Sequence, residues 1–302
     1  MQTTLLVFVG ALRSYAAASQ VAHFLSSHNL SRELEVSFGG GGWSTEHQRW
    51  EHLCNALLHR PTSLVQHGLH LEFGTRNAAM LNILARGFNR TIWHGFDSFQ
   101  GLPQGSGAKE WSSGKYSTGG VLPKVESNVK LHAGWFNETL PRFFHSHPAP
   151  VAFMHMDADI YSSTICVLDA IFEQCRHRAG TVIAFDELFG TASQLQQEYR
   201  ALVEASTRWG VQYQYITYGL TRKSLYARAA IQVTDVGKRC YDALIGDHVE
   251  ELLLHHKGPI ARAVGRTSPD KCVRLGLNAS KKPWILKVPT RNVIHAGEIE
   301  QA

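Results

Sequence analysis

VAFMHMDAD, residues 151–159, is a mostly apolar run that ends in acidic residues, and it decides the fold of this chain. A second run of the same kind, TVIAFDE, follows at residues 181–187. Short apolar runs bounded by polar residues predict buried strands of a parallel sheet, here residues 151–156 and 181–185. The carboxyl ends of such strands line the crevice where ligands bind. We therefore expect Asp157, Asp159, Asp186 and Glu187 to lie around one site.

These carboxylates suggest a metal centre. Negative charges that are packed together repel one another, and Mg²⁺, which prefers oxygen ligands, neutralises them. The alternative is that the acids cap the helices that follow the strands, because Asp and Ser are good N-cap residues. Two successive strands that both end in acids favour the metal site over the caps.

Apolar periodicity predicts the rest of the sheet. Residues 69–73 and 91–97 have the composition of strands, and residues 78–86 have the period of a helix between them. The runs 210–218 and 225–233 are joined by a short turn, so they must pair antiparallel, because a parallel pair needs a crossover. The pattern predicts an α/β, Rossmann-like fold: a mostly parallel sheet flanked by helices, with a C-terminal antiparallel hairpin.

Three parts are expected along the chain. Residues 1–60 form an N-terminal segment, residues 61–233 the main domain, and residues 234–302 a C-terminal extension of unknown role with a helix near 248–255. Residues 1–18 have either the apolar core of a cleaved signal peptide or the pattern of a packed N-terminal element. Sequons occur at four positions that do not decide between these readings: Asn29, Asn89, Asn137 and Asn278. The loop 98–128 is rich in Gly, Ser and Pro and is predicted to be a functional lid or a disordered loop.

Composition excludes several classes of protein. The net charge of +5 comes from scattered basic residues, so no stripe for a nucleic-acid backbone is present. The sequence contains no stretch of 18 or more apolar residues, so no membrane span is predicted. The five cysteines form no CxxC and are expected to be buried or incidental thiols, with at least one unpaired within a monomer. The seventeen histidines lack zinc-site spacing, so no zinc site is predicted.

The end of the first predicted strand suggests a nucleotide-type cofactor. Gly74 follows Glu72 and Phe73 and allows the backbone to approach a ligand at the start of the next helix. Asp97 ends the second strand at about the spacing of an acid that binds ribose hydroxyls. Acids at strand ends and single glycines are also common in proteins that bind no cofactor. On these residues alone, a cofactor site and an ordinary strand end both stay open.

Five motifs in order over residues 69–233 resemble the macrocin O-methyltransferase family. They are Leu71-Glu72-Phe73-Gly74, the segment 95–103 (GFDSFQGLP), the segment 134–141 (GWFNETLP), the segment 155–164 (HMDADIYSST) and Asp186-Glu187. Members of this family are S-adenosylmethionine-dependent enzymes that methylate sugar hydroxyls of macrolides. The resemblance implies a class I methyltransferase fold that uses S-adenosylmethionine and Mg²⁺.

The resemblance also assigns roles to residues. Asp157, Asp186 and Glu187 are implied as metal ligands; the residues implied for the cofactor are Glu72, Gly74, Asp97 and Ser98. We predict that Asp157 or His155 takes the proton from the acceptor hydroxyl.

Two further residues or segments stand out against the family pattern. Glu198 matches a helix motif seen in the family and has no assigned role, with a helix-face ion pair as the simple reading. The turn 75–79 (TRNAA) lacks the small Gly/Ser residues usual in the family, which narrows the predicted cofactor turn.

The predicted acceptor is a sugar-like small molecule, with the lid residues Trp111 and Tyr116 near it. Three readings compete: the methyltransferase, a methyltransferase-like scaffold without catalysis, and a nicotinamide-dependent oxidoreductase, which the missing phosphate-binding glycines disfavour. A homo-oligomer is left open. The compartment is also left open, with the cytoplasm slightly favoured over the secretory pathway because S-adenosylmethionine is made in the cytosol.

Overall fold

The structure, a computed structural model, describes most of the central part of the chain. The described residues are 52–54, 56–57, 59, 68–103, 111–189, 193–220 and 227–247, with two short strands at 36–38 and 285–286. The predicted signal peptide at residues 1–18 and the predicted helix at 248–255 lie outside these residues.

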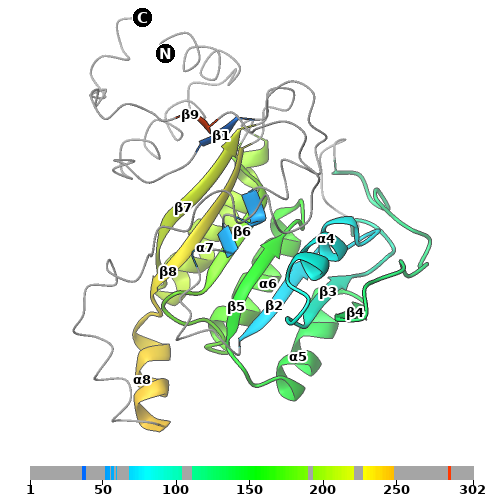
Figure 1. The fold of residues 1–302 in the computed structure, drawn as a ribbon. Coiled ribbons are helices and arrows are strands. Elements are labelled where there is room, and N and C mark those ends of the chain that lie inside the picture. Colours follow the sequence, from blue (N-terminus) through cyan, green and yellow to red (C-terminus); the bar gives the residue numbers. More distant parts are fainter. Residues whose placement is uncertain are drawn as a thin grey trace, which may run out of the picture.

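One mixed sheet organises the described residues (Figure 1), with the strand order β4-β3-β2-β5-β6-β8-β7-β1-β9. The strands from β4 to β6 run parallel, whereas β8 is antiparallel to both β6 and β7. At the far edge, β1 pairs parallel with β7 and antiparallel with β9. The predicted α/β, Rossmann-like fold with a C-terminal antiparallel hairpin is confirmed.

The strands are β1 (Val36–Phe38), β2 (Leu69–Phe73), β3 (Trp93–Asp97), β4 (Val129–Ala133), β5 (Val151–Met156), β6 (Val182–Phe189), β7 (Gln212–Leu220), β8 (Ala227–Asp235) and β9 (Ile285–Leu286). The helices are α4 (Ala79–Gly87), α5 (Phe136–Ser146), α6 (Tyr161–Glu173), the 3₁₀ helix η2 (Gln194–Gln196), α7 (Glu198–Trp209) and α8 (Lys238–Asp247).

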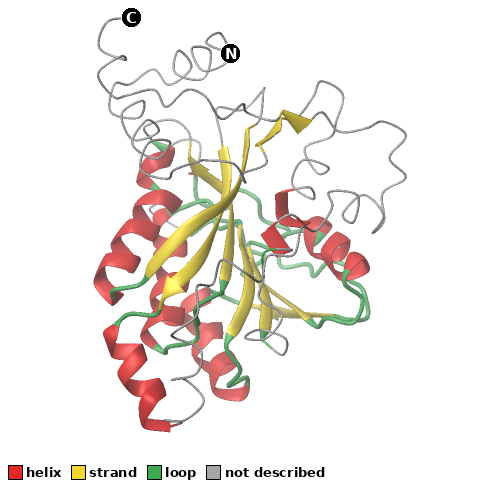
Figure 2. Cartoon of the chain, turned by 60° about the vertical axis from the view of Figure 1, so that its left-hand side comes forward, coloured by secondary structure: helices red, strands yellow, loops and turns green. Residues whose placement is uncertain are grey.

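Helices cover both faces of the sheet (Figure 2). On one face α5, α6 and α7 pack on alternate side chains of β2, β5 and β6, such as Phe73, Met154 and Phe185, in the larger core. On the other face α4 and the helical residues 52–54 and 56–57 cover Trp93 and Phe153. The period-2 alternation of the strands therefore separates two cores.

The predicted boundaries hold where strands are wholly buried, as in β2 and β5, and are wrong for β6. That strand was expected to end at Phe185 but continues to Phe189, because β8 pairs beyond that point, with Phe189 opposite Ala227. Asp186 and Glu187 therefore lie within a strand and not after it. The helix α8 was not predicted.

The prediction of incidental thiols is wrong for Cys175 and Cys240, which form a disulfide. Their thiols are 65 residues apart in the sequence, so only the folded chain brings them together. Cys166 is a free cysteine.

Within the described residues, every helix is too short or too polar to cross a membrane. The division into segments 1–60, 61–233 and 234–302 stays a prediction.

Candidate functional site

The carboxyl ends of β2, β3 and β5 meet at one edge of the sheet, as the strand pattern predicted. Backbone hydrogen bonds join the loops there: the N–H of Gly74 donates to the carbonyl of Phe96 (3.0 Å), and the N–H of Asp157 donates to the carbonyl of Phe73 (2.9 Å). This edge, from Gly74 to Asp157, is called the carboxyl edge below. In an open parallel sheet it is the expected position of a ligand.

Gly74 is required at this edge by both its conformation and its surroundings. Its φ is +91°, and a Cβ added there would lie 1.8 Å from the carbonyl oxygen of Asp157. No other residue type fits that space without moving the loop after β5. The glycine therefore lets the turns after β2 and β5 touch.

The turn after Gly74 is strained at residues other than glycine. Arg76 has φ +46° and Ala78 has φ +55°, both in the left-handed region that costs a residue with a Cβ about 1–2 kcal/mol. Asn77, between them, is of a type that tolerates this region better, but the positive φ lies on both sides of it. Strain of this kind concentrates at functional sites, where surrounding contacts hold it in place.

Asp97, predicted to bind the cofactor ribose, holds two turns together through its carboxylate. Its Oδ2 accepts the N–H of Arg76 (2.7 Å), and its Oδ1 accepts the N–H of Phe99 (2.6 Å). The hydroxyl of Ser98 donates to the carbonyl of Gly101 (3.2 Å). Both side chains thus lie at the predicted place and shape the edge; their contact with a cofactor stays a prediction.

Glu72 and His155 face each other across β2 and β5 on a buried part of the sheet. His155 Nδ1 lies 3.0 Å from Glu72 Oε1, and the residues are 1% and 2% exposed respectively. Burial lowers the pKa of His155, but the hydrogen bond to Glu72 and its charge outweigh this, so the pKa is raised overall. The second carboxylate oxygen of Glu72, His155 Nε2 and the hydroxyl of Thr75 are buried without a hydrogen-bond partner in the described part of the chain.

Asp186 is paired with a residue that the sequence analysis did not single out. Arg228, on the neighbouring strand β8, donates from Nε to Asp186 Oδ1 at 2.7 Å. The side chains are 10% and 2% exposed, so this is a buried ion pair. The two residues are 42 positions apart, and only the antiparallel pairing of β6 with β8 brings them together.

The predicted metal site stays a prediction, and one of its three ligands already has a cationic partner. The three carboxylates are the oxygen donors that Mg²⁺ prefers, but the guanidinium of Arg228 already neutralises Asp186. Across the described residues, no group of three or more His, Cys, Asp or Glu side chains is arranged to hold a metal ion. Asp157 and Glu187 are half-buried at the same edge.

Glu198 is a bridge and not part of a helix-face ion pair. It is 1% exposed at the start of α7, where Oε1 accepts the N–H of Ala158 and Oε2 accepts the N–H of Glu187, each at 3.3 Å. Burial and the nearby charges of Glu187 and Asp157 raise the pKa of Glu198 well above its usual range. The residue therefore joins the loop after β5 to β6, the two elements that carry the predicted site acids.

The described part of the lid is fixed to the carboxyl edge. The N–H of Gly120 donates to the carbonyl of Phe99 (2.9 Å), and Trp111 is 3% exposed. Tyr116 is 36% exposed, with the guanidinium carbon of Arg76 at 5.1 Å from its ring centroid. Of the two lid aromatics, Tyr116 is the one available to an acceptor.

Comparisons with known proteins agree with this geometry. The family model Macrocin-O-methyltransferase (TylF) matches residues 120–207, the segment with His155, Asp157, Asp186, Glu187 and Glu198. No curated protein matches the chain.

Three solved structures are similar to the chain at a distance. CalS11, a calicheamicin methyltransferase, is 21% identical with a TM-score of 0.47, covering 62% of this chain and 78% of that one. The apo structure of CalS11, a TDP-rhamnose 3'-O-methyltransferase, is 23% identical with a TM-score of 0.41, covering 62% of this chain and 79% of that one. An O-methyltransferase from Bacillus cereus in complex with SAH is 14% identical with a TM-score of 0.41, covering 65% of this chain and 84% of that one. Residues 120–207 match the macrocin O-methyltransferase model, so the resemblance predicted from the sequence is confirmed over this segment of the chain.

Proposed function

We propose that this chain transfers the methyl group of S-adenosylmethionine to a hydroxyl of a sugar or a similar small molecule. The macrocin O-methyltransferase match supports the reaction type, and CalS11 is a TDP-rhamnose 3'-O-methyltransferase, an enzyme that acts on a sugar nucleotide. The observation that carries the proposal is the carboxyl edge, where the turn at Gly74 is pressed against the loop of Asp157.

The residues around Gly74 fit such a cofactor. Glu72 Oε2 and Thr75 Oγ1 flank this glycine and are buried without a partner in the described part of the chain. Orphaned buried oxygens cost free energy unless a donor reaches them. The methionyl ammonium group of S-adenosylmethionine is a donor of the required kind, and Asp97 and Ser98 are the proposed residues at its ribose end.

Asp157 is the proposed general base. When bound, the cofactor supplies an electrophilic methyl group on its sulfonium. The acceptor oxygen must lose its proton as the bond to this methyl forms, and a carboxylate at the edge accepts that proton. Asp157 is half-buried there. His155 is 1% exposed and bonded to Glu72, so we assign it to holding Glu72 in place.

Magnesium dependence stays a prediction. The carboxylates of Asp157, Asp186 and Glu187 suit the ion chemically. However, Asp186 is bonded to Arg228, and within the described residues no three such side chains are arranged to hold a metal ion. We therefore assign no step to a metal.

Calorimetry with S-adenosylhomocysteine tests the cofactor site. Wild-type protein is expected to bind, and Gly74→Ala to lose binding, because the added Cβ meets the carbonyl of Asp157 at 1.8 Å. Gly119→Ala is the matched control: Gly119 also has a positive φ, +66°, but nothing lies within 4 Å of its Cβ. Failure of the wild type to bind would favour the scaffold reading, which the strained turn at Arg76 and Ala78 also supports.

Transfer of labelled methyl groups to sugar hydroxyls tests the base. Asp157→Asn is expected to lower kcat by about 10²–10⁴-fold, the usual contribution of a general base, while S-adenosylhomocysteine binding persists. Asp159→Asn, two residues further along the same loop, is the control. Equal activity of the two variants would contradict the assignment of Asp157.

A further inference from the structure

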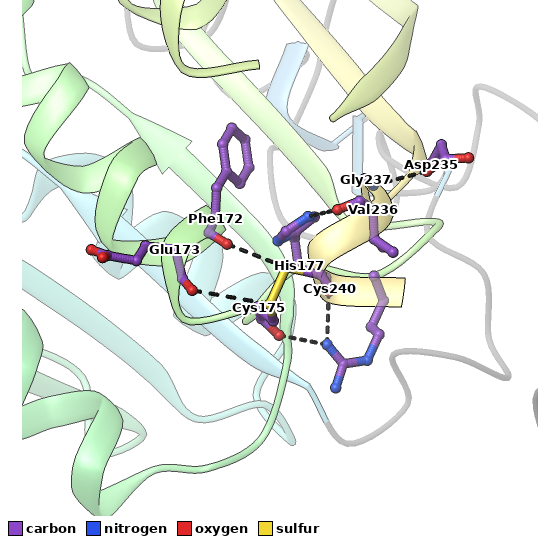
Figure 3. Close-up of a disulfide and its surroundings, with 9 residues drawn as sticks. Phe172, Glu173, Cys175, His177, Asp235, Val236, Gly237 and Cys240 are labelled. Carbon is purple, nitrogen blue, oxygen red and sulfur yellow. Dashed lines mark hydrogen bonds between the residues drawn. A yellow bond between two sulfur atoms is a disulfide. The ribbon is translucent and has the colours of Figure 1, made fainter. Parts of the chain in front are cut away.

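The cysteines of the described fold are mostly oxidised. Cys175, just after α6, is joined to Cys240 in α8, with their Cα atoms 5.3 Å apart (Figure 3). Cys54 is disulfide-bonded as well. Disulfides form and persist in oxidising compartments and are rare in the cytosol, where thiols are kept reduced.

The disulfide lies in a contact that other bonds also hold. His177 donates from Nε2 to the carbonyl of Val236 at 3.0 Å, next to the disulfide (Figure 3). The N–H of Gly180 donates to the carbonyl of Val233 at 2.8 Å. Cys240 is 2% exposed. The two thiols are therefore brought together by the native packing of α8 on the end of α6, and oxidation of the pair belongs to the folded state.

An exposed turn elsewhere on the fold carries a sequon. Asn89-Arg90-Thr91 has the sequence Asn-x-Ser/Thr with no proline in the middle. The segment is a turn between α4 and β3, closed by a hydrogen bond from the N–H of Thr91 to the carbonyl of Phe88 (2.9 Å). Asn89 and Arg90 are exposed in that turn. An exposed turn accommodates a bulky glycan without disturbing the core.

The position of this turn would also keep a glycan away from the carboxyl edge. The turn precedes β3, so it lies at the amino ends of the parallel strands, opposite the carboxyl edge. The second described sequon begins at Asn137, in the first turn of α5 after β4, on the catalytic side. There the hydroxyl of Thr139 donates to the carbonyl of Trp135 (3.0 Å). Asn89 is therefore the described site that a glycan occupies without crowding the reaction.

We propose that Asn89 is an N-glycosylation site and that the chain folds in an oxidising, glycosylating compartment. In the transfer, Asn89 Nδ2 forms a bond to the anomeric carbon of a lipid-diphosphate-linked oligosaccharide. The bond from that carbon to the phosphate oxygen breaks, the lipid diphosphate leaves, and the amide loses one proton to the medium. Formation of the disulfide releases two protons and two electrons, which a thiol–disulfide oxidant of the compartment accepts.

The test is expression of the full chain in cultured eukaryotic cells, followed by digestion with an amidase that removes N-glycans. The wild type is expected to migrate faster on the gel after digestion. In Asn89→Gln and Thr91→Ala this change in mobility is expected to be smaller, by the amount that one glycan causes. Thr91→Ser keeps the sequon and is expected to keep the shift. Asn137→Gln is the control on the catalytic side, and its shift at Asn89 is expected to persist.

Two results would overturn the proposal. One is a wild-type chain without a digestible glycan, or a shift that Asn89→Gln leaves unchanged. The other is alkylation of Cys175 and Cys240 in the unfolded but unreduced protein, which would show that these thiols are not oxidised. Neither readout depends on methyl transfer, so an inactive enzyme with a glycan on Asn89 would contradict only the proposed function.

Discussion

Removal of Arg228 is expected to destabilise the fold strongly. Arg228→Met keeps a long apolar side chain but removes the buried cation bonded to the carboxylate of Asp186, which is 2% exposed. Breaking one side of a buried ion pair costs about 3–5 kcal/mol, because an uncompensated charge stays out of water. At about 2–4 °C per kcal/mol, the melting temperature should fall by about 6–20 °C.

The chain offers a matched control for this variant. Arg86 and Glu126 form an ion pair at the same distance, 2.7 Å, but their side chains are 58% and 39% exposed. Arg86→Met is expected to cost less than about 1 kcal/mol, because water screens exposed pairs. The comparison keeps the N–O distance constant and changes the burial of the pair.

Thermal unfolding followed by circular dichroism, in the presence of a chelator, measures both variants. The double variant Asp186→Val/Arg228→Met is expected to recover much of the lost stability, since replacing both charges removes the cost of burying one alone. In a separate series without chelator, a divalent cation should stabilise Arg228→Met more than the wild type, because the cation neutralises the carboxylate of Asp186 in place of Arg228. Equal melting temperatures for Arg228→Met and Arg86→Met would refute the reasoning.

Three further predictions concern other parts of the fold. Cys175→Ser/Cys240→Ser is expected to lower the free energy of unfolding by about 2–4 kcal/mol, because the bond closes a long loop; Cys166→Ser is the control in denaturant titrations, and equal loss there would contradict it. Arg76→Gly should stabilise the chain by about 1 kcal/mol, because glycine accepts a positive φ freely; a lower melting temperature would show that the side chain matters more than the strain. Glu198 has a folded pKa above its unfolded value, so its stabilising contribution is present below about pH 4.5 and is lost as the pH rises through the folded pKa. Glu198→Gln should therefore flatten the stability profile above that pH, and parallel profiles for variant and wild type would contradict the raised pKa.

The sequence was sufficient for the parts of the fold that depend on local pattern. The strand β5 is buried on both faces, so its apolar run has clear limits and the predicted bounds agree with the structure. The end of β6 depends instead on pairing with β8, which no local pattern reveals. The helix α8 was missed for a similar reason, since its place is set by the contact of Cys240 with Cys175.

The candidate site shows the same division. The positions of Glu72, Gly74 and Asp157 followed from strand ends, because parallel strands bring their carboxyl ends together. The partners of these residues did not follow, because a hydrogen bond between distant strands depends on register. A cation opposite Asp186 was nevertheless implied by the chemistry: a carboxylate at the end of a buried run needs compensation. The structure places Arg228 beside Asp186, and the metal expected at the three carboxylates stays a prediction.

Glu198 gives this difference a mechanistic meaning. Its carboxylate accepts one N–H from the loop of Asp157 and one from Glu187, so it couples the two elements whose acids face the proposed acceptor. A neutral side chain of the same shape, as in Glu198→Gln, replaces one acceptor by a donor and leaves one of these N–H groups unpaired. If the proposed base is positioned through this bridge, the variant should lose kcat more than cofactor affinity, since Gly74 and Asp97 lie on other loops. A fall in cofactor affinity with kcat unchanged would mean that Glu198 supports the fold of the whole edge and not the position of Asp157.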